Sequence, residues 1–181
     1  MNKKTSKKLK PKYKVLFVSS EVHPFAKTGG LGDVCNSLPH SLKSLYQDIN
    51  ILIPGYPFAI EKAETINRVA TIKLPQSGFP GNLGLPVING QIPSVNILET
   101  KLPGSQVKVW MIESELYNRP GTPYSDNEGR EFADNDFRFA LLNYIAVEIA
   151  MGRTTLNWHA DIVHANDWQT GLISVLLEKE H

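Results

Sequence analysis

The stretch Lys27-Thr28-Gly29-Gly30-Leu31-Gly32-Asp33 decides the fold, because it separates an apolar run from a run with helical spacing. The apolar run, Val15 to Val18, predicts a buried strand. The run that follows the glycines ends near Leu45 and predicts a helix. Glycines at the start of a helix let backbone N–H groups approach an anion closely, and the helix dipole adds about half a positive charge there. The segment therefore predicts a strand, a glycine loop and a helix, with room for a phosphate at the turn.

Two charged residues extend this prediction from a phosphate to a sugar nucleotide. Lys27 supplies a mobile cation beside the turn, and Asp33 is a carboxylate that a sugar hydroxyl could bind. The alternative is that the glycines only shape a tight turn. The loop has neither the Gly-x-Gly-x-x-Gly order of a dinucleotide fold nor the Gly-Lys-Ser/Thr ending of a P-loop, so neither of these nucleotide motifs applies.

The rest of the chain alternates between strand-like and helix-like runs. The continuous apolar runs Val15 to Val18 and Ile49 to Ile53 are typical of strands buried on both faces of a parallel sheet. Between them lies a helical apolar face, and Pro39 is expected to kink or divide that helix. The residues that form the apolar face are Leu31, Val34, Leu38, Leu42 and Leu45.

A proline- and glycine-rich segment from Pro54 to about Pro103 interrupts the alternation. Its β-like runs, Arg68 to Leu74 and Pro93 to Glu99, predict a small antiparallel hairpin inserted at the sheet edge, and Gly78-Phe79-Pro80-Gly81 lies between them. The alternation then resumes with a strand at 107–112, a helix at 132–151, a strand at 161–164 and a helix at 168–177. The predicted fold is α/β, a Rossmann-like parallel sheet with helices on both faces and a β-rich insertion.

Ligands of such folds bind at the carboxyl ends of the strands. Lys27, Tyr117 and Asp167 each follow a predicted strand, so we expect all three at this edge.

Charge and cysteine content limit the class of protein. The formal net charge is +1, but seven of the 19 basic residues fall between Lys3 and Lys14, which leaves 12 basic against 18 acidic residues elsewhere. Residues 1–12 are therefore expected to be a disordered basic tail, and the acidic remainder argues against nucleic acid as a partner. The single Cys35 fits a reducing cytoplasm and a structural role, with a reactive thiol at the helix start as the alternative. No apolar run is long enough to predict a membrane span.

Read as one segment, Lys14 to Asp33 resembles the amino-terminal signature of the bacterial glycogen synthase and plant starch synthase family. Four further blocks occur in the order found in that family. They are Leu52-Ile53-Pro54-Gly55-Tyr56-Pro57, Tyr117 to Tyr124, Asp136 to Leu142, and Asp161 to Gln169. Together the blocks extend the resemblance over about residues 13 to 177.

The resemblance implies the amino-terminal half of a two-domain GT-B glycosyltransferase, which transfers glucose from ADP-glucose to the non-reducing end of an α-1,4-glucan with retention of configuration. It implies that Lys27 contacts donor phosphate and that Gly29 and Gly30 let the backbone approach the donor. Asp33 and Asp167 become the candidate catalytic residues, near the acceptor and the sugar. No metal or other cofactor is implied.

Four more residues carry weaker predictions. Glu21 is a candidate ligand for glucan hydroxyls, with a solvated or helix-capping carboxylate as the alternative, and Tyr117 is a candidate stacking surface for glucose, with ordinary burial as the alternative. Tyr124 is a less favoured stacking surface. His164 is expected to pack at a strand end, and Trp168 is also expected to pack.

The resemblance covers only one domain of such an enzyme, so residues 13–181 are expected to form a partial, acceptor-side domain. The carboxyl-terminal nucleotide-binding domain and the family's Val-His-Asn block are not in the sequence, and this chain alone is expected to be inactive. The alternatives are a non-catalytic glucan-binding module or an inactive truncated remnant, a split enzyme whose carboxyl-terminal half is a separate chain, and a related enzyme with a donor such as UDP-glucose. Exposed apolar residues of the last helix, Leu172, Val175 and Leu176, predict aggregation or dimerisation.

Overall fold

The two apolar runs that were predicted as strands pair with each other in parallel. In the computed structural model, which describes residues 13–74 and 94–179, β1 (Lys14–Val18) lies beside β2 (Asp48–Pro54), with Val15 opposite Ile49. The strand β6 (Ile162–Ala165) pairs in parallel with the other side of β1, and β5 (Lys108–Glu113) pairs in parallel with β2. These four strands form the parallel part of the sheet and confirm the predicted alternation.

The insertion forms an antiparallel hairpin at the sheet edge, as predicted. The strands β3 (Asn67–Lys73) and β4 (Ser94–Lys101) pair with each other, and β4 also pairs antiparallel with β5. The sheet is therefore mixed, with the order β3-β4-β5-β2-β1-β6. The expected Gly78-Phe79-Pro80-Gly81 turn and the predicted tail at 1–12 lie outside the described residues.

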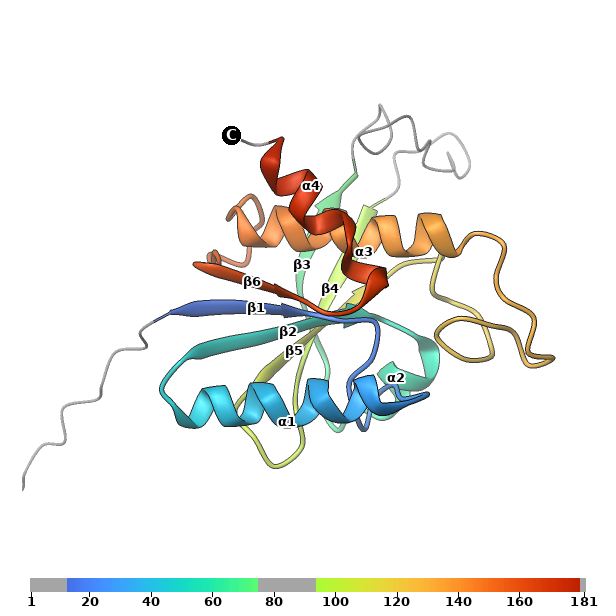
Figure 1. Cartoon of the computed structure of the whole chain (residues 1–181), viewed down its shortest axis with the longest axis horizontal. Helices are drawn as coiled ribbons and strands as arrows, with labels where there is room; N and C mark the ends of the chain where they lie inside the picture. Colours follow the sequence, from blue (N-terminus) through green and yellow to red (C-terminus); the bar gives the residue numbers. More distant parts are fainter. Residues whose placement is uncertain (1–12, 75–93, 180–181) are drawn as a thin grey trace, which may run out of the picture.

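Helices cover both faces of the sheet (Figure 1). The helix α1 (Gly30–Ser44) lies on one face, and α3 (Asn135–Ala150) lies on the other together with α4 (Leu172–Glu178). The short helix α2 (Pro57–Glu61) follows β2, and the 3-10 turn η1 (Trp168–Thr170) precedes α4. Because η1 is a separate turn, the single helix predicted at 168–177 is wrong at its start.

Two helices differ from the predictions in detail. The helix α1 runs without interruption through Pro39, whose ring is buried, so the predicted division is wrong. Burial of the ring in the core offsets the single backbone hydrogen bond that proline removes. The helix α3 begins at Asn135 rather than Phe132 and is buried on nearly all sides, because it contacts β1 and β2 on one side and η1 and α4 on the other.

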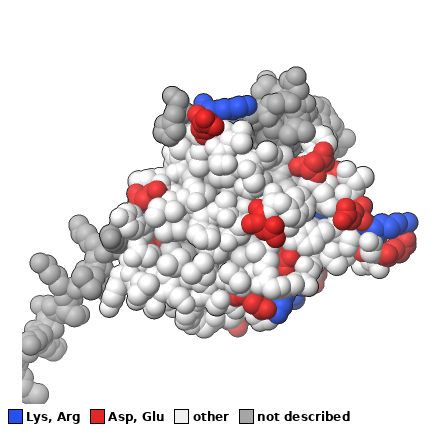
Figure 2. Space-filling view, viewed as in Figure 1, with Lys and Arg blue, Asp and Glu red and all other residues white. Residues whose placement is uncertain are grey.

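The surface carries scattered charges over this architecture. On the face shown in Figure 2, acidic side chains are dispersed and the described residues form no continuous basic patch. Within residues 13–74 and 94–179, no helix has both the length and the apolar character needed to cross a membrane.

Candidate functional site

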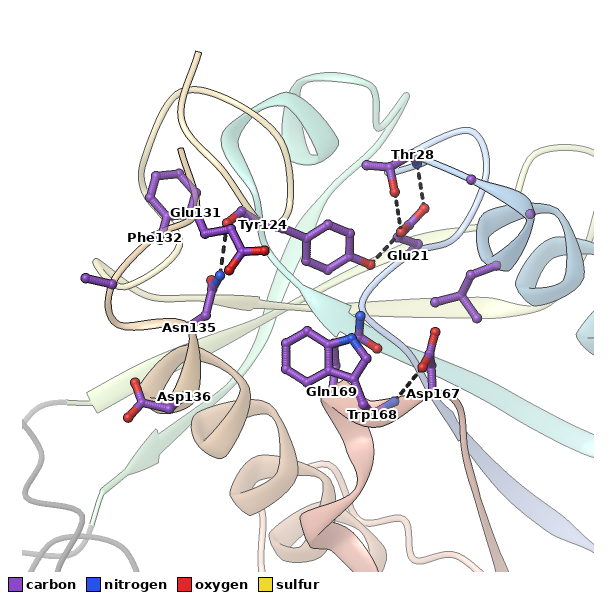
Figure 3. A pocket seen from close by; sticks show the side chains of 14 residues that line it. Glu21, Thr28, Tyr124, Glu131, Phe132, Asn135, Asp136, Asp167, Trp168 and Gln169 are labelled. Carbon is purple, nitrogen blue, oxygen red and sulfur yellow. Dashed lines mark hydrogen bonds between the residues drawn. The ribbon is translucent and has the colours of Figure 1, made fainter. Parts of the chain in front are cut away.

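A pocket of about 580 Å³ lies at the carboxyl edge of the parallel strands (Figure 3). Its walls come from the loop after β1, the first turn of α1, the loop before α3 and the turn after β6. Four carboxylates line it, from Glu21, Glu131, Asp136 and Asp167, and no lysine or arginine is among its described lining residues. Such a lining fits an uncharged, hydroxyl-rich ligand such as a sugar. The other lining residues are Thr28, Gly29, Gly30, Leu31, Tyr124, Phe132, Ala133, Asn135, Trp168 and Gln169.

The glycine loop opens the first turn of α1 to this pocket. Gly29 is the N-cap residue of α1, and no side chain caps the helix. A Cβ added at Gly29 or Gly30 would meet nothing within 4 Å, and neither residue has a positive φ. The turn therefore has no steric need for glycine at these two positions, which argues against the purely structural alternative. The open backbone leaves N–H groups of the helix start accessible to a ligand.

The Glu21 carboxylate holds the glycine loop through hydrogen bonds. Its side chain is buried, with a residue exposure of 2%, and it accepts hydrogen bonds from the Thr28 backbone N–H (2.6 Å), from Thr28 Oγ1 (2.7 Å) and from the Tyr124 hydroxyl. Figure 3 shows these bonds converging on one carboxylate. Glu21 lies in the pocket wall as predicted for a ligand of sugar hydroxyls, but three protein donors already occupy its oxygens. The structure thus gives it a role in holding the loop.

Lys27 and Asp33 form an ion pair with each other. The distance from Lys27 Nζ to Asp33 Oδ1 is 2.7 Å, and their side chains are 42% and 58% exposed. Neither residue is part of the pocket lining. The structure therefore places both residues beside the glycine loop, as predicted. Asp33 lies outside the pocket that the carboxylates of Glu21 and Asp167 line.

Asp167 has an unusual backbone conformation. Its φ of 65° and ψ of 178° lie in a region that is essentially restricted to glycine, where a non-glycine residue costs about 1–3 kcal/mol. The conformation is held because Asp167 Oδ1 accepts from the Trp168 N–H at 2.7 Å and its carbonyl accepts from Thr170. Asn166, one residue earlier, donates to the Val18 and His164 carbonyls. A strained acidic residue in a pocket wall is a common feature of functional sites.

Trp168 and Gln169 were not predicted as site residues, and Trp168, which was expected to pack, does so only along one edge of its ring. Trp168 is 62% exposed and meets Phe139 of α3 edge-on, with ring centroids 5.2 Å apart. Gln169 is 3% exposed and its Oε1 has no hydrogen-bond partner. The sequence block Asp161 to Gln169 indicated that this turn is part of the site. It did not predict that Trp168 is exposed and Gln169 buried, because both depend on contacts with α3.

Tyr117 lies in the core rather than at the sugar site. Its ring is fully buried and its hydroxyl donates to the Arg138 carbonyl at 2.7 Å, so the predicted stacking of Tyr117 on glucose is not supported. Tyr124, the less favoured candidate, is the tyrosine that lines the pocket. Burial, followed by the hydrogen bond to Glu21, raises the pKa of Tyr124.

A buried arginine positions the loop that carries Tyr124. Arg138 of α3 is 1% exposed and donates to the carbonyls of Leu116 and Pro123 and to Asn135 Oδ1. Its guanidinium also lies 4.6 Å from the centre of the Phe132 ring. These contacts fold residues 114–134 against the pocket, so that four further residues line it: Glu131, Phe132, Asn135 and Asp136. The sequence alone does not predict these four residues, because their position depends on Arg138.

His164 and Cys35 pack inside the protein and have structural roles. His164 stacks on Phe17 at 4.6 Å, which agrees with the expected strand-end packing. Cys35 is buried and donates to Ser19 Oγ, and burial raises the pKa of its thiol to about 11, against the reactive alternative. No group of three or more His, Cys, Asp or Glu residues suited to a metal occurs in the described part of the chain.

Comparison with known proteins identifies the family. Residues 14–181 match the family described as "Starch synthase catalytic domain". The chain is 41% identical over 165 residues to "Glycogen synthase" of Thioalkalivibrio sulfidiphilus and 44% identical over 168 residues to "Glycogen synthase 1" of Methylococcus capsulatus. These matches cover 91% and 92% of this chain but 32% and 31% of those proteins, so the chain spans about a third of the length of the relatives it matches.

A solved structure supports the fold independently. The "Catalytic domain of Starch Synthase IV from Arabidopsis thaliana bound to ADP and acarbose" matches 92% of this chain and 30% of its own, with a TM-score of 0.67 and 22% sequence identity. At that identity the match shows the fold, which corresponds to the amino-terminal part of a GT-B starch synthase. From the sequence match over residues 14–181, the chain belongs to the starch synthase catalytic domain family of glycosyltransferases.

Proposed function

We propose that this chain is the acceptor-side part of a glycogen synthase, which transfers glucose from ADP-glucose to the non-reducing end of an α-1,4-glucan with retention. The observation that carries the proposal is the pocket in which the uncapped start of α1 faces the carboxylates of Glu21 and Asp167. The family and the two glycogen synthase relatives support the same activity.

The two halves of the pocket suit different parts of the reaction. The carboxylate-lined wall is suited to the hydroxyl groups of glucose, with Asp167 accepting a hydroxyl hydrogen bond near the reacting sugar. The N–H groups at Gly29 and Gly30 are suited to negative charge that develops on the departing diphosphate. Within residues 13–74 and 94–179, the exposed Lys27 side chain bonds only to Asp33, so it could exchange that carboxylate for a phosphate. Asp33 would then be free to bind an acceptor hydroxyl.

The reaction requires more than this chain supplies. With no lysine or arginine among the described lining residues, the pocket offers little charge for a diphosphate. We infer that basic groups of a second domain complete the donor site, from the same polypeptide or from a separate carboxyl-terminal half. A cytoplasmic location, predicted from the single Cys35, agrees with a nucleotide-sugar substrate.

The test is transfer of labelled glucose to glycogen by the purified chain, with and without the remaining two-thirds of the Methylococcus capsulatus relative as a separate protein. Transfer from ADP-glucose only with both parts would support the proposal, and UDP-glucose in a parallel reaction would establish donor preference. Absence of transfer with both parts, together with binding of glycogen by the chain, would favour a non-catalytic glucan-binding module. Transfer by the chain alone would contradict the need for a second part.

A further inference from the structure

A second pocket, of about 350 Å³, lies at the amino ends of the parallel strands, on the edge opposite the carboxylate-lined pocket. Asp48 and Lys108 in its lining are the first residues of β2 and β5, and residues 155–158 belong to the loop before β6. The seven residues of β2, at about 3.3 Å each, set the two edges roughly 20 Å apart. A cavity of this size is typical of a site for a small ligand.

Two indoles form the apolar part of this amino-edge pocket. Trp110 is 2% exposed, and Trp158 is partly exposed. Their rings meet edge-on with centroids 5.3 Å apart, and Trp158 Nε1 donates to Asp48 Oδ2 at 3.0 Å. These contacts fix the Trp158 ring, so its exposed part is a preformed stacking surface.

Two neutral polar side chains stand beside the indoles. Thr155 and Asn157 line the same pocket and are exposed, and neither side chain makes a hydrogen bond within residues 13–74 and 94–179. A threonine hydroxyl and an asparagine carboxamide can each donate and accept a hydrogen bond. The pocket therefore combines a fixed aromatic surface with free donors and acceptors.

The charged groups of the lining are already paired within the protein. Glu99 Oε2 accepts from Lys108 Nζ at 3.0 Å and from Trp110 Nε1 at 2.9 Å. Lys108 is thus engaged by a carboxylate, so the pocket does not favour an anionic ligand such as a nucleotide. A pyranose ring has an apolar face of C–H groups and a rim of hydroxyls. An indole flanked by a hydroxyl and a carboxamide matches both features.

We propose that the amino-edge pocket is a second binding site for the α-1,4-glucan, in which Trp158 stacks on a glucose ring and Thr155 and Asn157 bind its hydroxyls. The identity of the sugar polymer rests on the proposed function, whereas the site itself rests on the pocket. Its role is to hold the polymer at the amino edge while a chain end reacts at the carboxyl edge. Such tethering raises the effective concentration of chain ends at the reacting pocket.

The three tryptophans report separately on the two pockets when the indole nitrogens of the 181-residue chain carry nitrogen-15. Trp168 lines the carboxyl-edge pocket, whereas Trp110 and Trp158 line the amino-edge pocket. Trp158→Phe assigns the Trp158 indole signal in the NMR spectrum. Maltoheptaose should shift this signal in wild type, and the shift should persist in Asp167→Asn, which alters the other pocket.

A double variant, Thr155→Val with Asn157→Gly, removes the two polar groups and leaves the backbone unstrained. Asn157 has a φ of 50°, which glycine adopts freely, and valine has nearly the shape of threonine. Loss of two hydrogen bonds should weaken maltoheptaose affinity, measured from the Trp158 shift, by about tenfold, with little change in the melting temperature. The Trp168 response should be unchanged. Asn127→Gly, at an exposed position outside both pockets, should titrate like wild type.

The enzyme reconstituted with the carboxyl-terminal two-thirds of the relative tests the role of the site. The double variant should raise the glycogen concentration that gives half-maximal transfer by about tenfold. Transfer to maltotriose, which is too short to reach both edges of the sheet, should stay the same. An equal loss with maltotriose would show that the substitutions disturb the reacting pocket, and the tethering role would be wrong.

The outcomes separate this inference from the proposed function. If the reconstituted enzyme transfers glucose but maltoheptaose leaves the Trp158 signal unshifted, the second site is wrong while the proposed function stands. A Trp158 shift that disappears in Asp167→Asn, or that the double variant retains at full affinity, would also overturn the site. If the Trp158 shift behaves as expected but no transfer occurs, the proposed function fails and the second site stands.

Discussion

The Tyr124 hydroxyl donates a hydrogen bond to Glu21 Oε1 and thereby joins two segments that are 103 residues apart. Glu21 holds the glycine loop through Thr28, and Tyr124 belongs to the loop that Arg138 folds against the pocket. The same tyrosine hydroxyl also lies 2.9 Å from Ser20 Oγ. The start of α1 and the loop before α3 are therefore positioned as one unit, although no sheet hydrogen bond connects them.

Tyr124→Phe should separate these two segments without removing the aromatic ring. The lost hydrogen bond has a charged acceptor in a partly buried position, so the free energy of unfolding should fall by about 1–2 kcal/mol. Urea denaturation gives this value. Tyr46→Phe, which alters a tyrosine that is 61% exposed, should change it by less than about 0.5 kcal/mol. Equal effects of the two substitutions would show that the Tyr124–Glu21 bond contributes little.

Gly30→Ala should affect ligand binding and leave the fold intact. A Cβ at Gly30 meets nothing within 4 Å, and alanine in a helix is favoured over glycine, so stability should stay the same or rise by about 0.4–1 kcal/mol. Glucan binding and transfer in the reconstituted enzyme should fall, because the methyl group enters the pocket.

Gly55→Ala provides the contrasting control for this experiment. A Cβ at Gly55 would lie 2.7 Å from the Ile112 carbonyl oxygen, so this variant should lose about 1–3 kcal/mol in urea denaturation. A comparable loss for Gly30→Ala would mean that Gly30 is needed by the turn itself, and the ligand-based explanation of the glycine loop would then fail.

Hydrophobic pattern predicted the fold well because the parallel strands are buried on both faces. Val15 to Val18 and Ile49 to Ile53 are continuous apolar runs, and both became neighbouring strands. The hairpin at the edge was also predicted from two short β-like runs. Local rules failed at Pro39, where packing of a buried ring outweighed the helix-breaking tendency of proline.

The site was predictable only as far as local motifs define it. Gly29, Gly30, Glu21 and Asp167 follow directly from motifs at strand ends, and all four line the pocket. The sequence could not predict that Tyr124 lines the pocket while Tyr117 is buried. Both positions depend on Arg138, whose carbonyl accepts from the Tyr117 hydroxyl and whose guanidinium donates to the Pro123 carbonyl in the loop of Tyr124. The exposure of Trp168 likewise depends on the packing of η1 against α3.

Alkaline pH should destabilise the protein through groups that are buried in their neutral forms. Burial raises the pKa of Cys35 from 9.0 to about 11 and raises the pKa of Tyr56, Tyr117 and Tyr124 above the ordinary 10.0. Below about pH 8 these groups are protonated in both the folded and the unfolded state, so the stability is fully present. Above it the unfolded state loses protons first, and stability falls by at most about 1.4 kcal/mol per pH unit for each group.

Urea denaturation at pH 7, 9, 10 and 11 measures this dependence. The free energy of unfolding should fall by less than about 1 kcal/mol between pH 7 and pH 9 and then decrease more steeply. Cys35→Ala should make the decrease between pH 9 and pH 10 about half as steep, because the three tyrosines also begin to lose protons in the unfolded state over this range. A wild-type curve that is flat to pH 11 would contradict the burial of these groups in the folded state.

At most positions a glycine variant is less stable than the alanine variant, but Asp167→Gly should be more stable than Asp167→Ala. Both remove the hydrogen bond from the Trp168 N–H, but alanine keeps the strain of a φ of 65° with a ψ of 178°, whereas glycine adopts this conformation freely. Because the strain exceeds the greater chain entropy of glycine, the glycine variant should be about 1 kcal/mol more stable in urea denaturation.

Asp167→Asn separates the backbone from the charge. The asparagine oxygen can still accept from the Trp168 N–H, and asparagine has nearly the same shape as aspartate and carries the same backbone strain, so stability should remain near that of wild type. Maltoheptaose binding and glucose transfer should nevertheless fall in all three variants if the carboxylate binds a sugar hydroxyl. If Asp167→Ala is as stable as Asp167→Gly, the backbone at this position is not strained. If Asp167→Asn retains full transfer, the charge of Asp167 is not needed and its role is confined to holding the η1 turn that carries Trp168 and Gln169.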